Sequence, residues 1–229
     1  MCEYIKSTLP EGSITIKSYK TIYQQTKNEI IEKKSRFIGT AVPVNSKDEA
    51  EAKIKDLQKL YKDATHNCFA YRVIEGNQII ERQNDDGEPS GTAGMPILTV
   101  LRGEELLNVA IVVTRYYGGI LLGTGGLNRA YGGGAKASIT GVIQKDRYHM
   151  YSIKLDYTLH GSIAYELTKT KAIVKDTVFT ENVEVIVYIT EEESEGFIKN
   201  IIELSQGKAE INLVKTAYGF FYEDNFYEE

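Results

Sequence analysis

The segment 109–126 reads VAIVVTRYYGGILLGTGG and passes from an apolar run into a glycine-rich turn. Val109–Thr114 is apolar up to its last residue and rich in β-branched side chains, which is typical of a strand buried on both faces. A helix is expected over Leu127–Gln144. Glycine disfavours a helix by roughly 1 kcal/mol relative to alanine, so the run Gly132-Gly133-Gly134 indicates close packing of this helix against the sheet.

Upstream of this segment, the pattern predicts two helices and four strands. Ser46-Lys47-Asp48-Glu49 has the form of a capping box, with a hydroxyl at the N-cap and a carboxylate three residues later. Apolar residues then follow at helical spacing. Gly76-Asn77 is a plausible hairpin turn. The expected helices are 46–63 and 96–101, and the expected strands are 27–32, 37–44, 68–74 and 78–83.

Downstream of Asp146, the sequence predicts a second domain. Alternating apolar residues over 151–159 indicate a strand, and Thr190-Glu191-Glu192-Glu193 has the form of a second capping box, opening a helix that Gly207 ends. A helix over 161–171, a hairpin of 173–179 and 183–189, and a last strand at 211–221 complete the order β-α-β-β-α-β. This order is the ferredoxin-like pattern, which assigns no chemistry by itself. The chain is therefore expected to be α+β, with domains at 1–145 and 146–229.

Length and composition agree with a two-domain cytoplasmic protein. The chain has 229 residues and contains no apolar run of the roughly 20 residues that a membrane span needs. Residues 1–19 mix charged and apolar positions, unlike a signal peptide. Cys2 and Cys68 do not indicate a disulfide, and the few cysteines and histidines have no zinc-ligand spacing. No metal or cofactor is expected.

The charge of the chain is unevenly distributed. Up to Lys145 there are 19 basic and 16 acidic residues, and beyond it there are 8 basic and 16 acidic residues. The acidic C-terminal tail (Glu223, Asp224, Glu228 and Glu229) is expected to be solvated. Because phosphate neutralisation needs a basic surface, the second domain is a poor generic nucleic-acid binder, although a local basic patch remains compatible with its charge. Neither DNA nor a membrane is an expected partner.

The first candidate site is the loop Asp85-Asp86-Gly87-Glu88. Three carboxylates within four residues can bind a cation, act as acid and base, or receive a basic partner. The alternative is a solvated turn. Prolines and glycines in the following residues give this loop a defined shape, which favours a functional role.

The second candidate is the turn that follows the buried strand. Its glycines, Gly118, Gly119 and Gly123, expose backbone N–H groups before a helix N-terminus, where an anion is favoured. The alternative is that they serve turn geometry and packing alone. Arg115 with Tyr116 and Tyr117 offers a charged aromatic contact surface, although either tyrosine could equally belong to the core. Neither a P-loop ending nor the dinucleotide fingerprint is present.

His66 is the third candidate, as a general base near Asp85 or Asp86. A lone histidine is more often a hydrogen-bonded structural residue, and no nucleophile motif accompanies it. If the protein is an enzyme, His66, Asp85, Asp86 and Glu88 are its expected catalytic residues.

These residues also carry a resemblance to a known family. Residues 85–94 (DDGEPSGTAG) and 112–123 (VVTRYYGGILLG) resemble the signature of the IMPACT/YigZ family. KSRFI at 34–38 and ATHNCFAY at 64–71 fit the same pattern. The resemblance spans roughly residues 29–140.

This resemblance implies a fold and a field of function. The first domain is expected to be like the second domain of ribosomal protein S5. The second is expected to be like a late, ferredoxin-like domain of elongation factor G. Eukaryotic relatives regulate translation through protein contacts, by competing for an activator of an initiation-factor kinase. Their separate N-terminal binding domain is not expected in this chain, so this role in the kinase pathway is not expected to carry over.

Three functional hypotheses follow. The leading one is a binding or regulatory protein linked to translation or stress, with Asp85, Asp86, Glu88, Arg115, Tyr116 and Gly119 on its contact surface. Contact with RNA or the ribosome is its more specific form. The alternative is a hydrolase or phosphate-handling enzyme, which requires His66 and the Asp85/Asp86/Glu88 cluster to converge in one pocket.

Overall fold

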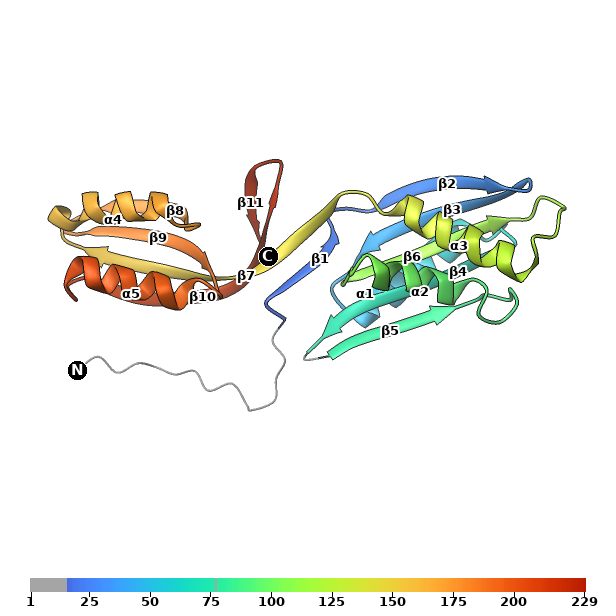
Figure 1. Cartoon of the computed structure of the whole chain (residues 1–229), viewed down its shortest axis with the longest axis horizontal. Helices are drawn as coiled ribbons and strands as arrows, with labels where there is room; N and C mark the ends of the chain where they lie inside the picture. Colours follow the sequence, from blue (N-terminus) through green and yellow to red (C-terminus); the bar gives the residue numbers. More distant parts are fainter. Residues whose placement is uncertain (1–15, 77) are drawn as a thin grey trace. The chain divides into compact units, whose positions relative to one another are not determined.

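The computed structural model describes residues 16–76 and 78–229. Asn77 of the expected hairpin turn lies outside the described residues. So do residues 1–15, which include Cys2 and most of the segment expected to differ from a signal peptide. The described chain is α+β, with five helices and two sheets, and its contacts divide between Ile143 and Gln144 into two compact units (Figure 1). None of the described helices combines the length and the apolar character needed to cross a membrane.

The first unit contains an antiparallel sheet in the order β2-β3-β6-β4-β5. Its central strand β6 (Val109–Tyr116) is buried from Val109 to Arg115, so the expected strand with two covered faces is confirmed. The other strands of this unit are β1 (Ser18–Ile22), β2 (Thr26–Glu32), β3 (Ser35–Pro43), β4 (His66–Glu75) and β5 (Gln78–Asn84).

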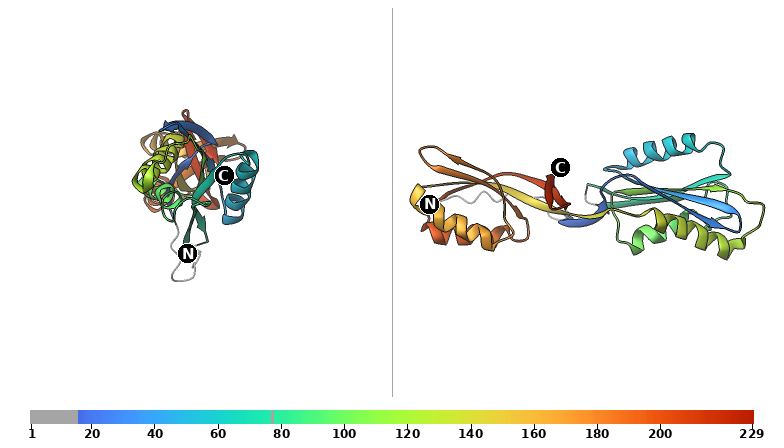
Figure 2. Two further views of the ribbon diagram at one scale, coloured as in Figure 1. Left: turned by 90° about the vertical axis from the view of Figure 1, so that its right-hand side faces the viewer. Right: turned by 90° about the horizontal axis from the view of Figure 1, so that it is seen from above.

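Helices cover the two faces of this sheet. The helix α1 (Lys47–Leu60) lies on one face, while α2 (Gly94–Gly103) and α3 (Gly123–Ser138) lie on the other (Figure 2). Each face has its own core, with Ile54 and Tyr71 under α1 and with Phe37 and Tyr131 under α3. The alternation of side chains along β6 therefore decides which of its residues meets which helix.

The predicted N-cap of α1 is confirmed. The Ser46 hydroxyl accepts a hydrogen bond from the N–H of Glu49 at 3.1 Å, and the Glu49 carboxylate accepts one from the N–H of Asn45 at 2.8 Å. The carboxylate thus reaches one residue beyond the N-cap, which still satisfies a free donor before the helix.

For the helix α3, the expected packing is confirmed but the expected boundaries are wrong. A Cβ on Gly39 of β3 would lie 2.1 Å from the carbonyl oxygen of Gly134, and a Cβ on Gly134 would lie 3.2 Å from the Val113 side chain, so the expected close packing of the glycine run against the sheet is confirmed. The predicted helical range 127–144 is wrong at both ends, because α3 begins at Gly123 and ends at Ser138. Gly141 has φ +64°, a left-handed turn conformation that separates the helix from the next strand.

The second unit has the predicted element order β-α-β-β-α-β followed by one further strand. Its sheet runs β11-β10-β7-β9-β8, and α4 and α5 lie on one face of it (Figure 2). The elements are β7 (Val142–Leu155), α4 (Tyr157–Lys169), β8 (Ile173–Phe179), β9 (Val183–Thr190), α5 (Ser194–Ser205), β10 (Glu210–Tyr222) and β11 (Asn225–Glu228).

Several details of this unit differ from the prediction. The strand expected over 151–159 ends at Leu155, because Asp156 is the N-cap of α4 and the remaining alternation belongs to a helix. The Thr190 hydroxyl does pair with Glu193, but the two residues close a turn, and α5 begins only at Ser194.

The acidic tail is not simply solvated. Residues 225–228 form β11 against β10, and the Glu228 carboxylate accepts a hydrogen bond from the Tyr188 hydroxyl at 2.7 Å. Glu229 forms an ion pair with Lys145. Strand pairing supplied partners for these carboxylates that the charge pattern alone did not indicate.

Candidate functional site

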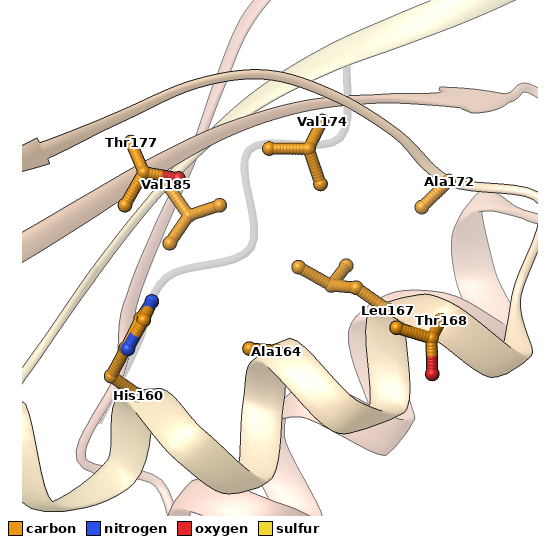
Figure 3. Close-up of a pocket in the computed structure, with 8 residues that line it drawn as sticks. All are labelled: His160, Ala164, Leu167, Thr168, Ala172, Val174, Thr177 and Val185. Carbon is orange, nitrogen blue, oxygen red and sulfur yellow. The ribbon is translucent and has the colours of Figure 1, made fainter.

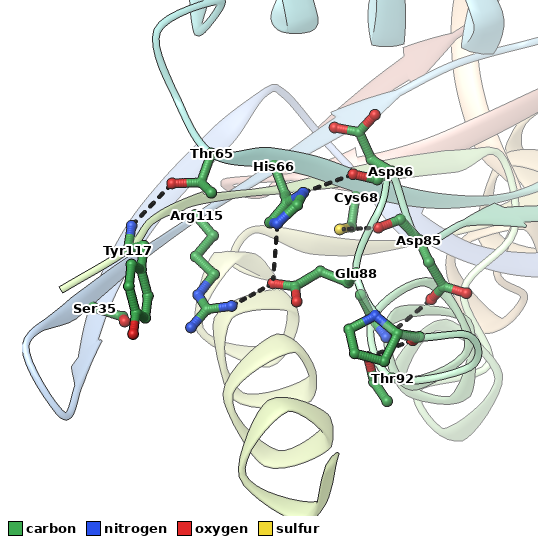
Figure 4. A network of polar contacts seen from close by, with 12 residues as sticks. Ser35, Thr65, His66, Cys68, Asp85, Asp86, Glu88, Thr92, Arg115 and Tyr117 are labelled. Atoms are coloured by element: carbon green, nitrogen blue, oxygen red, sulfur yellow. Dashed lines mark hydrogen bonds and ion pairs between the residues drawn. The ribbon is translucent and has the colours of Figure 1, made fainter. Parts of the chain in front are cut away.

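The predicted site residues meet at one end of the first unit's sheet. There β4 begins with His66, which is paired in register with Arg115, the last residue but one of β6. The loop 85–93, between β5 and α2, lies over this end, and α3 passes beneath it (Figure 4).

Glu88 and Arg115 form the buried centre of the site. One carboxylate oxygen of Glu88 accepts hydrogen bonds from Arg115 Nη1 at 2.6 Å and from the Tyr131 hydroxyl at 2.7 Å. The side chains of Glu88 and Arg115 are only 4% and 7% exposed. A charge buried without its partner is strongly unfavourable, so this pair holds the loop, β6 and α3 together.

The Arg115 guanidinium lies between two aromatic rings. Its central carbon is 5.4 Å from the ring centre of Phe37 and 5.3 Å from that of Tyr117. Tyr117 itself is 45% exposed. Arg115 therefore fixes the exposed Tyr117 ring on its inner side through a cation–π contact.

His66 is held in one tautomer. Its Nδ1 lies 2.7 Å from the carbonyl oxygen of Asp86, and since a carbonyl can only accept, Nδ1 carries the proton. Its Nε2 lies 4.0 Å from Glu88 Oε1, longer than a hydrogen bond. The imidazole thus links β4 to the loop through this hydrogen bond, and its Nε2 is directed at the Glu88 carboxylate (Figure 4).

Asp85 caps the helix α2. Its carboxylate accepts hydrogen bonds from the N–H groups of Gly91, Ala93 and Gly94 at 2.8, 3.0 and 2.8 Å. Burial raises the pKa of Asp85, but these backbone donors outweigh it and hold the pKa below its ordinary value. The carboxylate therefore remains ionised and is committed to the helix N-terminus.

Asp86 and Gly87 form the bend of the loop. Both have positive φ, +45° and +87°. The Asp86 carboxylate accepts a hydrogen bond from the N–H of Asn67 at 2.6 Å, so it too is bonded to backbone. These contacts fix the loop against β4, and the carboxylates of Asp85 and Asp86 do not point together at His66 (Figure 4).

Cys68 and Tyr131 are buried beside Glu88 and remain protonated. Burial raises the pKa of the Cys68 thiol, and burial together with Cys68 and Glu88 raises the pKa of the Tyr131 hydroxyl. The thiol donates to the Asp85 carbonyl at 2.9 Å. A protonated, buried thiol is a poor nucleophile.

Tyr116 does not join this cluster. Because neighbouring residues of a strand point to opposite faces, its ring lies on the α1 side of the sheet, away from Arg115. Its hydroxyl donates to Asp63 at 3.1 Å, and Arg36 lies over its ring at 5.4 Å. There it lines an open groove of about 440 Å³ with Lys27 and Tyr61.

The glycines of the second candidate lie in the segment that joins β6 to α3. A Cβ on Gly118 would meet the Lys34 backbone at 2.1 Å, so this glycine permits contact with the turn between β2 and β3. Gly119 and Gly123 have φ of +83° and +72° in open space. The segment between them exposes Ile120 and Leu121, which are 40% and 82% exposed.

Tyr131 is the site residue that the sequence reasoning missed. It lies in α3, directly before the run Gly132-Gly133-Gly134, and none of the candidate site motifs includes it. The buried stripe of α3, which also holds Leu127, Ala130 and Gly134, places Tyr131 on the side facing the sheet. That helical spacing was the available indication.

Other possible sites offer less chemistry. No three His, Cys, Asp or Glu side chains gather closely enough to hold a metal ion within residues 16–76 and 78–229. A hollow of about 330 Å³ in the second unit lies between α4 and β8, with His160 at one end and Leu167 and Val174 along it (Figure 3). Its lining contains neither a carboxylate nor a lysine or arginine.

Comparison with known proteins places this site within a family domain. The Impact N-terminal domain matches residues 33–139, and a domain of unknown function (DUF1949) matches residues 153–208. A solved structure described as that of a hypothetical protein is similar, with a TM-score of 0.53 and 28% identity, covering 88% of this chain and 99% of its own.

Two bacterial relatives extend the similarity over most of the chain. The IMPACT family member of Haemophilus influenzae is 35% identical over 189 residues, covering 80% of this chain and 90% of its own. The IMPACT family member YvyE of Bacillus subtilis is 41% identical over 203 residues, covering 88% of this chain and 93% of its own. The resemblance expected from residues 29–140 is therefore confirmed, and the chain belongs to the IMPACT family.

Proposed function

We propose that this protein is a binding or regulatory protein linked to translation, and that its contact surface is the segment Tyr117–Leu121. The observation that carries the proposal is the exposure of large apolar side chains on this segment, with Leu121 82% exposed. Exposed apolar side chains held on a rigid scaffold are typical of protein contact sites.

The buried cluster supplies the rigidity. Arg115 lies at the end of β6, is paired with Glu88, and contacts the Tyr117 ring from inside. The N–H of Gly118 donates to the Ser35 hydroxyl at 3.1 Å, and the N–H of Tyr117 donates to the Thr65 hydroxyl at 3.1 Å. A segment fixed in this way loses little conformational freedom when a partner binds.

The hydrolase alternative finds weaker support. It requires His66 and the three carboxylates to converge, but only Glu88 approaches His66, at 4.0 Å, and it already accepts from Arg115 and Tyr131. Asp85 and Asp86 are bonded to backbone N–H groups. In this proposal His66, Asp86 and Gly87 fix the loop whose Glu88 holds Arg115 behind Tyr117.

The fold adds to the link with translation. The second unit's element order, with the sheet order β10-β7-β9-β8, supports a ferredoxin-like domain resembling a late domain of elongation factor G. We likewise assign the first unit to the fold of the second domain of ribosomal protein S5. A translation-associated protein is the preferred partner, and RNA or the ribosome is the alternative.

The test is affinity purification from lysate with matched variants. Leu121→Asp places a charge on the contact segment, and Leu60→Asp is the control, since Leu60 is exposed on α1 of the same unit. Each lysate is divided into RNase-treated and untreated halves. We expect the wild type and Leu60→Asp to retain the same protein partner after RNase, and Leu121→Asp to lose it.

Two results would contradict the proposal. A partner retained equally by Leu121→Asp and Leu60→Asp would remove the segment from the contact surface. A partner captured only without RNase would move the function to nucleic-acid binding.

A further inference from the structure

The turn between β2 and β3 has an unfavourable sequence for its shape. Glu32 pairs with Ser35, so Lys33 and Lys34 alone form a two-residue turn. Both have positive φ, +45° and +67°, as in a type I′ turn. Such turns prefer Asn-Gly, because L-residues with longer side chains are strained in this region. Two lysines in this strained conformation suggest a role other than making the turn.

This turn lies beside the proposed contact segment. Gly118 contacts the Lys34 backbone so closely that a Cβ would approach its carbonyl oxygen to 2.1 Å. The neighbouring Ser35 hydroxyl accepts the N–H of Gly118. In both views the β2–β3 turn and the segment between β6 and α3 lie together at the same end of the sheet (Figures 1 and 2). The two lysines therefore border the exposed apolar residues.

The turn itself is basic, while the carboxylates of the loop 85–93 at the same end of the sheet are bonded to backbone N–H groups and to Arg115. Lys33 and Lys34 are exposed, and neither forms an ion pair with the residues described. Glu32 is the adjacent acidic residue, while Arg36 and Glu29 neutralise each other through two hydrogen bonds of 2.9 Å. Arg129 is exposed on α3 and lies over its first turn, near Gly125.

We infer that the basic tip, defined as Lys33, Lys34, Tyr117, Ile120 and Leu121, docks an acidic segment of a partner protein that also carries apolar side chains. The lysines select negative charge, and Leu121 and Ile120 bury against apolar residues. This inference rests on the proposed function and names the partner chemistry of that same surface.

The composition of the tip favours protein over RNA. Single-stranded RNA is held by aromatic rings on which bases stack, together with a basic path for the backbone. The tip offers one ring, Tyr117, whose inner face is already occupied by Arg115, and its most exposed side chain is the aliphatic Leu121. Aliphatic side chains contribute to binding chiefly by burial against apolar partners.

The experiment measures the affinity of two labelled probes by fluorescence anisotropy. One probe is a glutamate-rich peptide with leucine at every fourth position, and the other is a single-stranded oligouridine. The charge variant is Lys33→Glu with Lys34→Glu. Its control is Lys53→Glu with Lys55→Glu, two exposed lysines of α1 in the same unit.

We expect the wild type and the α1 control to bind the peptide with equal affinity, and the Lys33/Lys34 charge variant to lose about tenfold or more. Peptide affinity should also fall as salt is raised, because exposed charges are screened. Equal peptide affinity in all three proteins would overturn the inference. Oligouridine binding that depends on the two lysines, without peptide binding, would overturn it in favour of nucleic acid.

A turn variant separates binding from folding. Lys33→Asn with Lys34→Gly fits the turn better, so it should raise the thermal midpoint by about 2–4 °C while weakening peptide binding. A raised midpoint with unchanged peptide affinity would show that the lysines do not contact the partner. The proposed function fails separately, since it depends on Leu121→Asp losing the lysate partner. If Leu121→Asp loses the lysate partner while the Lys33/Lys34 charge variant retains it fully, only the inference is overturned.

Discussion

At the residue scale, the Glu88 carboxylate joins three segments that are far apart in the sequence. It lies in the loop before α2 and accepts from Arg115 of β6 and Tyr131 of α3. Conversion to the amide would leave the Arg115 guanidinium buried without a counter-charge. The consequence is a stability effect much larger than that of a surface ion pair.

The Glu88→Gln variant should therefore lose about 3 kcal/mol in the free energy of unfolding, measured by urea titration. The control is Glu29→Gln, which removes the carboxylate from the exposed pair with Arg36 and should cost less than about 1 kcal/mol. Similar losses of unfolding free energy in the two variants would show that the buried Glu88–Arg115 pair does not stabilise the fold more than a surface pair does.

Asp85 predicts a pH dependence. Its folded pKa is held below the ordinary value, so its contribution to stability is present above the unfolded pKa of about 4 and is lost as the pH falls through the folded pKa. Asp85→Asn should cost about 2 kcal/mol at pH 7, and the difference from the wild type should shrink below about pH 4.

The measurement is the free energy of unfolding of both proteins between neutral and acid pH. Asp56→Asn on the exposed face of α1 is the control and should show little difference at any pH. A wild-type advantage at Asp85 that did not change with pH would contradict the capping role of the ionised carboxylate.

At this scale the sequence indicated which residues come together in the fold better than it indicated which contacts each of them makes. It selected Asp85, Asp86, Glu88 and Arg115, and the structure brings all four to one end of the sheet. It could not separate a helix cap from an ion pair, because the three carboxylates differ only in which distant donors they meet. Tyr116 was grouped with them although strand alternation places it on the other face.

At the element scale, the contact between β3 and α3 depends on the absence of side chains. Gly39→Ala would drive a Cβ into the Gly134 carbonyl, so we expect it to cost about 3 kcal/mol or more, or to prevent folding. Gly132→Ala lies in the same helix, where the nearest atoms are at an ordinary contact distance of 3.9 Å. That variant should gain about 1 kcal/mol from helix propensity.

Thermal and urea unfolding of the two variants test whether Gly39→Ala lowers the stability while Gly132→Ala raises it. If both alanines destabilise the protein equally, the close approach of Gly39 to the Gly134 carbonyl does not explain the glycines of α3. Circular dichroism of the purified variants would show whether Gly39→Ala folds at all.

The types of element were predictable, while several of their ends were not. Hydrophobic spacing identified the helices because burial of one face stabilises them. The end of α3 at Ser138 depends on the turn at Gly141. The strand β7 ends at Leu155 because the backbone turns into α4 at Asp156, whose carbonyl accepts a hydrogen bond from the N–H of Leu159. In both places the apolar spacing alone fits either structure.

At the scale of the whole molecule, the hydrophobic cores follow the division of the chain. The clusters of the first unit and those of the second share no described residue. Ile201→Ala empties a fully buried position in the second unit and should lower its stability by about 3 kcal/mol.

Hydrogen exchange followed by mass spectrometry checks this expectation. Exchange should accelerate in β9 and α5 while β6 keeps its wild-type protection, since the cavity disturbs one core only. Ile111→Ala in β6 is the reciprocal variant, because Ile111 is fully buried in the first unit. Faster exchange in β6 of the Ile201→Ala protein would indicate that the two cores unfold together.

The sequence by itself determined the α+β class, the central buried strand, the order of elements and the loop that bears the site. These depend on local spacing, capping and turn residues, which act between neighbours along the chain. Only the tertiary structure decided that Glu88 pairs with Arg115 and Tyr131, that Asp85 caps α2, and that the Lys33-Lys34 turn lies against Gly118. Each of these contacts joins segments that are distant in sequence. They form only in the folded protein, because the register of the sheet fixes which residues lie side by side.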